Sequence, residues 1–127
     1  MATRPSTPAP ERSPRAVADA FDLGDLVAAL ADGTHDFAEF FRSPSGSLSL
    51  TVTRWPPGSI ADQQPHTEDE VYYIAHGRAV LTIARERVPM APGSVAFVAA
   101  GVDHRFSEID EDLEVLVFWS PARHTKA

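Results

Sequence analysis

The chain has 127 residues and a formal net charge of −7, and 43% of its residues are hydrophobic. This length suits one domain with its own core and is too short for a cofactor domain joined to a substrate domain. The acidic balance disfavours nucleic-acid binding, because the domain would repel phosphate groups, and the absence of cysteine excludes disulfide frameworks and thiolate chemistry.

The N-terminal segment differs in composition from the rest of the chain. Residues 1–15 hold four of the eleven prolines and show no hydrophobic periodicity. We therefore expect a disordered or extended arm there, followed by a single domain over residues 16–127. No apolar run is long enough to span a membrane, and the N-terminus lacks the apolar core of a secretory signal, so we expect a cytoplasmic protein with no membrane partner.

A short helix is predicted over residues 22–33. Three leucines and Val27 recur at the spacing of one helix face, Asp22 can cap the start, and Gly33 can end the helix. A helix with a single apolar face buries that face against another element. We therefore expect this helix to pack on a larger structure and to carry no chemistry of its own.

Beyond Gly33 the hydrophobic period changes from that of a helix to that of a strand. Glycine and proline separate short alternating segments, and one of the predicted turns lies at residues 89–93. The predicted strands span residues 35–42, 48–53, 71–74, 79–85, 94–99 and 114–120. Many short strands joined by close turns favour an antiparallel sandwich or barrel.

The residues that favour metal chemistry lie in segment 64–70 and at His104. In an extended segment, residues two apart face the same side, so Gln64 and His66 can project together and Glu70 can rejoin them after a short bend. Two imidazoles and a carboxylate, with an amide nearby, suit a divalent first-row transition metal. Histidine and glutamate are also common on solvated loops, so these residues alone leave the metal site open.

The spacing of glycines around these residues resembles the first motif of the cupin family. That motif, Gly-x5-His-x-His-x3-Glu-x6-Gly, is matched in spacing by Gly58, Gln64, His66, Glu70 and Gly77. The one departure is glutamine in place of the first histidine.

The second cupin motif has a counterpart further along the chain. That motif, Gly-x5-Pro-x-Gly-x2-His-x3-Asn, is matched in spacing by Gly93, Ala99, Gly101 and His104, with Glu108 at the asparagine position. Alanine replaces the motif proline, and glutamate replaces the asparagine. Both positions lie outside the usual ligand set, so these two departures matter less than the glutamine at position 64.

The resemblance implies an all-β fold, a cupin-type β-barrel or jelly roll with a short N-terminal helix. Carried over to this chain, it implies that His66, Glu70 and His104 hold one divalent first-row metal. Fe²⁺ is the first expectation, and Zn²⁺, Mn²⁺, Ni²⁺ and Cu²⁺ are chemically admissible. The resemblance further implies a small organic substrate and a homodimer.

Gln64 stands where the family motif has a histidine, and three interpretations remain open. Its amide oxygen can be a fourth, weak metal ligand. It can instead lie beside the metal and position water or substrate. The replacement can also mark a site that has lost its metal. In the first two cases Gln64 is a candidate both as a metal ligand and as a catalytic residue.

Tyr72 is the second candidate catalytic residue. It follows Glu70 by two positions, so on a regular strand it faces the same side, where a phenol can transfer a proton or orient substrate. The alternative is a core aromatic residue whose hydroxyl is satisfied locally. By the same spacing Phe106 is a candidate apolar wall beside His104.

For the remaining aromatic and histidine residues the expectations are structural. We expect Phe97, Phe118 and Trp119 to pack in the core or on the sheet, and we assign no role to His35 and His124.

We therefore expect a metal-dependent enzyme acting on a small organic molecule, with a dioxygenase-like oxygenase preferred. Redox-neutral isomerases, cyclases and lyases remain open, because proteins that resemble this one catalyse all of these reactions. A non-catalytic module that binds or senses a small molecule is the alternative from a different class.

Overall fold

The computed structural model describes residues 19–63 and 66–124, which form one short helix and nine strands. The helix is α1 (Leu23–Ala28). The strands are β1 (Asp36–Arg42), β2 (Ser49–Trp55), β3 (Ala61–Gln63), β4 (Asp69–His76), β5 (Ala79–Ile83), β6 (Glu86–Met90), β7 (Val95–Val98), β8 (His104–Ser107) and β9 (Leu113–Ser120).

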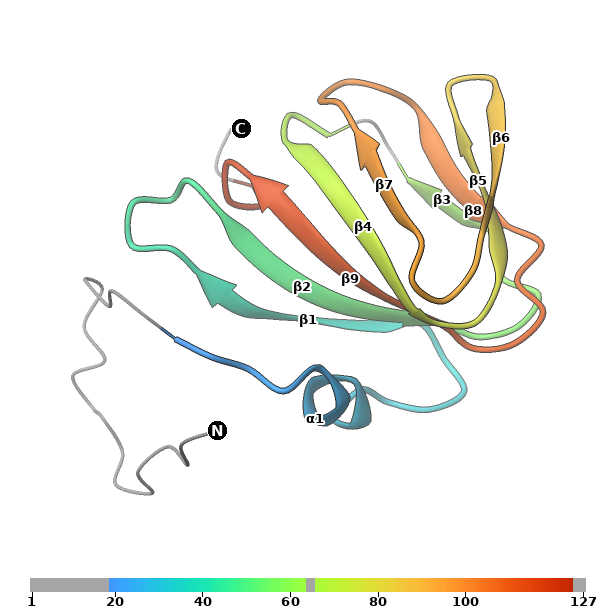
Figure 1. Ribbon diagram of the computed structural model, residues 1–127, viewed down its shortest axis with the longest axis horizontal. Coiled ribbons are helices and arrows are strands. Elements are labelled where there is room, and N and C mark those ends of the chain that lie inside the picture. Colours follow the sequence, from blue (N-terminus) through green and yellow to red (C-terminus); the bar gives the residue numbers. More distant parts are fainter. Residues whose placement is uncertain (1–18, 64–65, 125–127) are drawn as a thin grey trace.

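The strands form two sheets that curve toward each other (Figure 1). The larger sheet has the order β1-β2-β9-β4-β7, and the smaller sheet has the order β3-β8-β5-β6. Every strand pair is antiparallel. This arrangement confirms the predicted all-β barrel or jelly roll with a short N-terminal helix.

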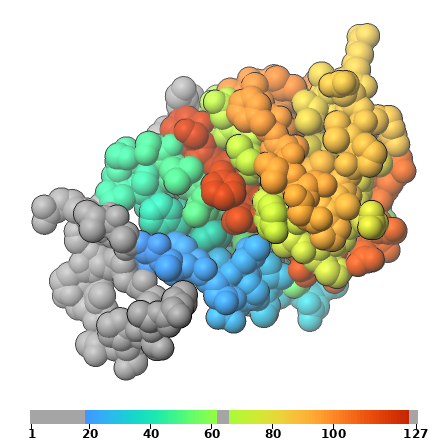
Figure 2. Space-filling view, viewed as in Figure 1, coloured from blue at the N-terminus to red at the C-terminus, as the bar shows by residue number. Residues whose placement is uncertain are grey.

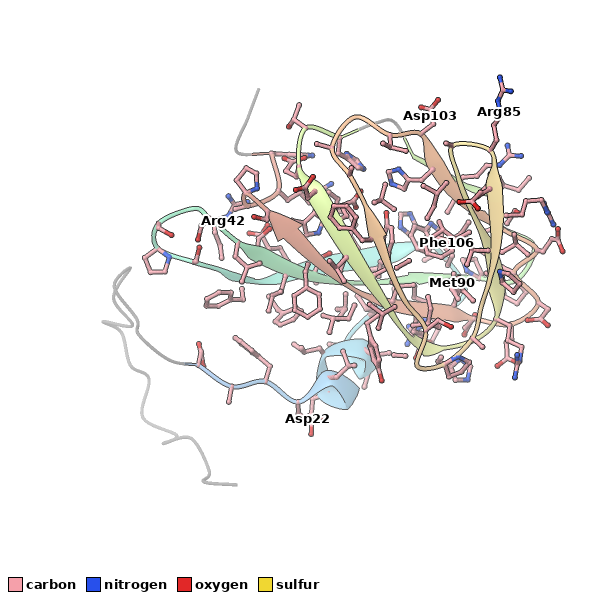
Figure 3. All side chains as sticks on the ribbon, turned by 45° about the horizontal axis from the view of Figure 1, so that its top comes forward. Asp22, Arg42, Arg85, Met90, Asp103 and Phe106 are labelled. Carbon is pink, nitrogen blue, oxygen red and sulfur yellow. The ribbon has the colours of Figure 1, made fainter. Side chains whose placement is uncertain are left out.

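The main core lies between the two sheets. Ile74, Leu81, Phe106, Leu113 and Val115 are all fully buried there. Burying a side chain of this size contributes about 1.5–3 kcal/mol, so the alternating apolar residues of the strands supply the stability of the barrel. In Figure 3 Phe106 lies within the barrel, whereas Arg85 projects away from it.

β2 is buried on both faces, because the barrel covers one face and α1 covers the other. Thr51 and Trp55 face inward and line a cavity. Val52 faces outward and packs with Val27 and Leu30 in a second apolar cluster. The helix therefore packs on the outside of the larger sheet, as its single apolar face predicts.

Arg54 connects β2 to the end of the helix. Its guanidinium donates to the carbonyl oxygens of Val27 at 3.0 Å, Leu30 at 3.1 Å and Ala31 at 3.0 Å, and to Glu114 Oε2 at 3.0 Å. Carbonyls at the end of a helix lack helical partners of their own. The helix ends at Ala28, earlier than the predicted end at residue 33. Arg54 is the hydrogen-bond donor for carbonyl oxygens in and just after the last turn of the helix.

The sequence prediction misses β3, β6 and β8. β3 and β8 are too short to show clear alternation, with three and four residues. β6 contains Pro89, which lies in the predicted turn at residues 89–93, so that turn is wrong at its start. Pro89 pairs with Val80 on an edge strand, where a missing backbone N–H is tolerated.

The outer face of the larger sheet is less covered than expected. Figure 2 shows atoms of β9 at the surface between β2 and β7. Phe118 of β9 is 36% exposed and Phe97 of β7 is 58% exposed, whereas Trp119 is only 5% exposed. Of these three aromatic residues, only Trp119 lies in the core, because it faces inward and its neighbour faces outward.

Two of the expectations concern residues outside the described ranges, namely the N-terminal arm at residues 1–15 and the position of Gln64. Among the residues that the structure describes, no helix combines the length and apolar character needed to cross a membrane.

Candidate metal centre

Three of the predicted site residues come together inside the barrel. Glu70 lies on β4 with its side chain inward, His104 begins β8, and His66 lies in the segment before β4. The two motif segments are joined directly, because the Gly101 N–H donates to the His66 carbonyl oxygen at 2.7 Å. Gly101 has a φ of 82°, a conformation that glycine adopts without strain.

The geometry of the three side chains is compact. One candidate ligand atom from each of His66, Glu70 and His104 lies within 4.8 Å of the others. Glu70 Oε1 is 3.1 Å from His104 Nε2 and 3.9 Å from His66 Nε2. Glu70 is 1% exposed and His104 is 4% exposed, whereas the His66 side chain is 20% exposed, so the cluster is buried on the His104 side and reaches solvent on the His66 side.

The protonation of His104 is the feature that points to a cation. Its Nδ1 lies 2.8 Å from the Val102 carbonyl oxygen, which can only accept, so Nδ1 carries the hydrogen. In a neutral imidazole, Nε2 then has a lone pair, and this buried atom makes no hydrogen bond although Glu70 Oε1 is close. A buried lone pair that faces a carboxylate oxygen is unfavourable, and a positive charge removes the conflict, either as a proton on Nε2 or as a cation held by both atoms. The donor set therefore fits a divalent metal ion.

The pKa shifts of the two histidines differ in direction. Burial lowers the pKa of His66, and His104 adds to this effect although Glu70 opposes it. Burial also lowers the pKa of His104, but the hydrogen-bonding influence of Glu70 and of the Val102 carbonyl outweighs it and raises the pKa overall. The inner end of the cluster therefore favours positive charge, whereas the outer imidazole stays available as a neutral ligand.

Tyr72 contacts the same carboxylate from the other side. Its hydroxyl donates to Glu70 Oε2 at 3.0 Å, and its side chain is 1% exposed. This bond holds Glu70 so that Oε1 faces the two imidazoles. Tyr72 thus lies on the predicted side of the strand, with its hydroxyl bonded to the candidate ligand Glu70.

A cavity of about 640 Å³ opens beside this cluster. Its described lining is mainly apolar and aromatic, with hydroxyl groups from β2 and one arginine. The lining residues are His35, Phe37, Thr51, Thr53, Trp55, Ser59, Ile60, Ala61, His66, Glu70, Tyr72, Val117, Trp119 and Arg123. A pocket of this size and character suits a small organic molecule. Phe106 is absent from the cavity surface because it packs behind Tyr72 and Trp55.

The sequence analysis misses His35 and Arg123 as cavity residues. The His35 ring stacks on Trp55 with centroids 5.0 Å apart and planes 9° apart, and its Nε2 lies 3.2 Å from Thr53 Oγ1. Arg123 follows the last strand and reaches back over two aromatic rings. The only sequence signal for this end of the cavity is the row of small hydroxyl residues on β2, which is too common to identify a site.

Comparisons with known proteins agree with this architecture. Residues 51–120 match the Cupin domain family. The chain is 41% identical over 102 residues to Uncharacterized protein SCO3923 of Streptomyces coelicolor, covering 80% of this chain and 95% of that protein. TT1209 from Thermus thermophilus has a TM-score of 0.70 at 24% identity and covers 83% of this chain and 99% of that one. A predicted oxalate decarboxylase from Thermotoga maritima has a TM-score of 0.61 at 25% identity, with 68% and 80% covered.

The family match extends over more than half of the chain and includes both segments that carry the clustered histidines and glutamate. The strand architecture agrees with that of the solved relatives. The chain is therefore a member of the cupin family.

Proposed function

We propose that this cupin is a metal-dependent enzyme that acts on a small organic molecule, with His66, Glu70 and His104 as the metal ligands. One observation carries the proposal, namely the buried Nε2 atom of His104, which faces Glu70 Oε1 without a hydrogen bond. A protein that used this barrel only for shape would gain nothing from keeping two such groups together in a nearly dry site.

Fe²⁺ is the ion we favour, because two imidazoles and one carboxylate leave coordination positions open for dioxygen and substrate. Zn²⁺, Mn²⁺, Ni²⁺ and Cu²⁺ fit the same donors. When bound, such a metal supplies Lewis acidity and, for iron, activation of dioxygen. Gln64 stays a prediction, either as a further ligand or as a residue that positions water or substrate.

The chain's own residues have three tasks in this proposal. Tyr72 holds the Glu70 carboxylate in place through its hydroxyl. Val102 holds His104 through its carbonyl, so that Nε2 points at the metal position. The aromatic walls around Trp55 and Trp119 exclude water and orient the substrate.

Within this class we favour an oxygenase of the dioxygenase type. A redox-neutral reaction, such as that of a lyase, isomerase or cyclase, is the second candidate. The observation in its favour is the likeness to the Thermotoga maritima protein, which is named for a decarboxylation. A metal-free binding or sensing module is the third candidate. A homodimer and a cytoplasmic location are further expectations that we retain from the family resemblance and the sequence.

The decisive experiment measures metal binding by the purified protein in competition with a chelator. We expect one Fe²⁺ or Zn²⁺ per chain, and we expect His66→Ala and His104→Ala each to remove most of it while the barrel stays folded. His76→Ala is the matched control, because that imidazole is 52% exposed and belongs to no metal cluster among the described residues. Absence of metal binding in the unchanged protein, or full occupancy in both site variants, would contradict the proposal.

A second measurement separates the reaction classes. The iron-loaded protein is incubated with a panel of small organic acids, ketones and phenols, with and without dioxygen. Consumption of dioxygen that depends on His104 supports the oxygenase. Turnover that continues in its absence supports the redox-neutral alternative.

A further inference from the structure

Arg123 is the one lysine or arginine among the described residues that line the cavity. Its guanidinium carbon lies 4.8 Å from the centroid of the Phe37 ring and 5.4 Å from that of Trp119. Two aromatic rings therefore hold the group by cation–π contacts. Such contacts use none of the N–H donors of the guanidinium.

The backbone around Arg123 is held from several directions. The Arg123 N–H donates to Ser49 Oγ at 2.8 Å, and the Arg123 carbonyl accepts from Arg42 at 2.8 Å. The His124 N–H donates to a carboxylate oxygen of Glu68. Ser49 and Glu68 are 0% and 2% exposed, so two buried polar side chains help to anchor this segment. The position of the arginine at the cavity is thus built into the fold.

No ion pair or hydrogen bond of the Arg123 guanidinium occurs within the part of the chain that the structure describes. The contrast with Arg54 and Arg87 is clear, because each of those arginines pairs with a glutamate. The protein as a whole carries a net charge of −7, whereas Arg123 places a positive charge at this end of the cavity. The missing partner is an anion.

The surroundings of Arg123 also indicate the shape of that anion. His35 stacks on Trp55 with planes 9° apart, and the Phe37 ring lies next to His35 with planes 21° apart. A stack of nearly parallel rings therefore forms one wall of the cavity, and its Phe37 ring contacts the arginine. Aromatic side chains favour a conjugated ligand, which can pack on them offset or edge to face, over a bulky saturated one.

Trp119 contacts both Arg123 and the metal cluster. Its ring lies 5.4 Å from the guanidinium carbon and 5.0 Å, centroid to centroid, from the His66 ring, and all three residues line the same cavity. A single small ligand can therefore reach both the arginine and the metal position without leaving the cavity.

We propose that the substrate is a planar organic carboxylate, whose carboxylate group binds the Arg123 guanidinium while its conjugated body lies along the ring wall toward His66. This inference rests on the proposed function, in which the cavity receives a small organic molecule. A guanidinium and a carboxylate form two parallel hydrogen bonds, which gives orientation as well as affinity. Arg123 is then a residue that determines specificity.

Two tryptophans make the test direct. Trp55 and Trp119 are the only tryptophans of the chain, and both line the cavity, so intrinsic fluorescence reports on the cavity. The metal-free protein is titrated with benzoate and, separately, with benzamide, which has nearly the same shape but no charge. Metal is left out because a carboxylate can also bind Zn²⁺ directly. We expect benzoate to bind at least about tenfold more tightly, as one charged hydrogen-bonded pair allows.

Variants assign the preference to one side chain. Arg123→Met should bring benzoate to the affinity of benzamide and leave benzamide unchanged. Arg123→Lys keeps the charge but loses the planar pair of donors, so its preference should be intermediate. Arg85→Met is the matched control, because Arg85 projects away from the barrel in Figure 3 and should keep the full preference.

Three results would overturn the inference: no benzoate binding, equal affinity for benzoate and benzamide in the unchanged protein, or a preference that survives in Arg123→Met. If Arg123→Met fails to fold, the comparison of the two ligands with the unchanged protein and with Arg123→Lys still decides. Metal titration of the same samples separates the two proposals. A protein that binds metal but shows no preference for carboxylate defeats this inference alone, and one that binds no metal but keeps the preference defeats only the proposed function.

Discussion

The two ends of the cavity are built in opposite ways. At the metal end, His66, Glu70 and His104 are charged or polar, close together and largely buried. At the ring end, His35, Phe37 and Arg123 are held mainly by stacking. The metal end holds its groups in one arrangement through hydrogen bonds from Tyr72 and to Val102. The ring end offers aromatic rings and one arginine that has no ion pair within the described ranges. Under the proposed function, the metal end would supply reactivity and the ring end would supply selectivity.

The largest expected effect follows from changing the metal end. Glu70→Gln removes the negative charge that faces both imidazoles, so we expect metal affinity to fall by more than about 100-fold, beyond the loss typical of groups that only support ligands. Without metal the variant should melt within a few degrees of the unchanged protein, because glutamine keeps the size of the side chain and an oxygen that can accept from the Tyr72 hydroxyl.

Chelator competition measures the metal affinity of Glu70→Gln, and thermal melting of the metal-free protein measures its stability. Glu111→Gln, at an exposed glutamate beside His76, is the control and should change neither. A Glu70→Gln variant that keeps its metal would remove the carboxylate from the ligand set.

A smaller effect is expected from the residue that supports Glu70. Tyr72→Phe deletes the hydroxyl that donates to Glu70 Oε2 at 3.0 Å but keeps the ring. We expect metal affinity to fall by about tenfold, as for other groups that orient a ligand. The measurement is the same competition assay, and melting of the metal-free variant within a few degrees of the unchanged protein would show that the ring still packs. An unchanged metal affinity would make Tyr72 a core residue only.

The ring end should respond independently of the metal. His35→Leu removes the ring that stacks on Trp55 and the bond to Thr53. We expect benzoate affinity to fall by roughly threefold to tenfold, the worth of one stacked pair, and metal affinity to stay the same. Fluorescence titration and chelator competition on one sample test this. Equal losses in both assays would mean that the two ends of the cavity act as one unit.

The smallest effect concerns His76, which lies at the far end of β4 from the metal cluster and serves as a reference for both ends. The carbonyl of Asp112, 2.9 Å from Nδ1, raises the pKa of His76 above its ordinary 6.5, and Glu111 adds to the effect. A raised pKa means that folding strengthens proton binding. The stabilisation is therefore complete below the unfolded pKa and is lost as the pH rises through the folded one.

Melting curves of the unchanged protein and His76→Ala at about pH 5.5 and about pH 8.5 bracket this titration. The gap in melting temperature should be larger at the lower pH, by a degree or two because the side chain is half exposed. A gap that grows at high pH would contradict the assigned shift. Metal and benzoate binding should be unaffected in this variant.

Much of the metal end could be predicted from the sequence because its residues lie in two short segments. His66 and Glu70 are four positions apart, and His104 follows a glycine-marked turn. Strand alternation then predicts which side each residue faces. The same rule predicts that Tyr72, two residues after Glu70, faces the same side. The prediction did not extend to the bond between Tyr72 and Glu70, because alternation gives the face of a strand but not the distance between two side chains.

The ring end could not be predicted, because it is assembled from residues far apart in the chain. His35 precedes β1, and Arg123 follows β9. They share a cavity only because β1 pairs with β2 and β2 pairs with β9. The sequence likewise placed Pro89 in a turn, because a proline in a strand is acceptable only on an edge, and the strand order decides which strand is an edge.

Local periodicity in the sequence by itself determined the strand-rich fold class and the helix that packs on the outside of the sheet. The candidate ligands came from the resemblance to the two cupin motifs. Only the tertiary structure decided that Nε2 of His104 faces Glu70 and that the Arg123 guanidinium reaches the cavity with no ion pair to residues 19–63 or 66–124. The physical reason is that charge pairing and cavity shape depend on distances between strands, and these arise from packing, not from position along the chain.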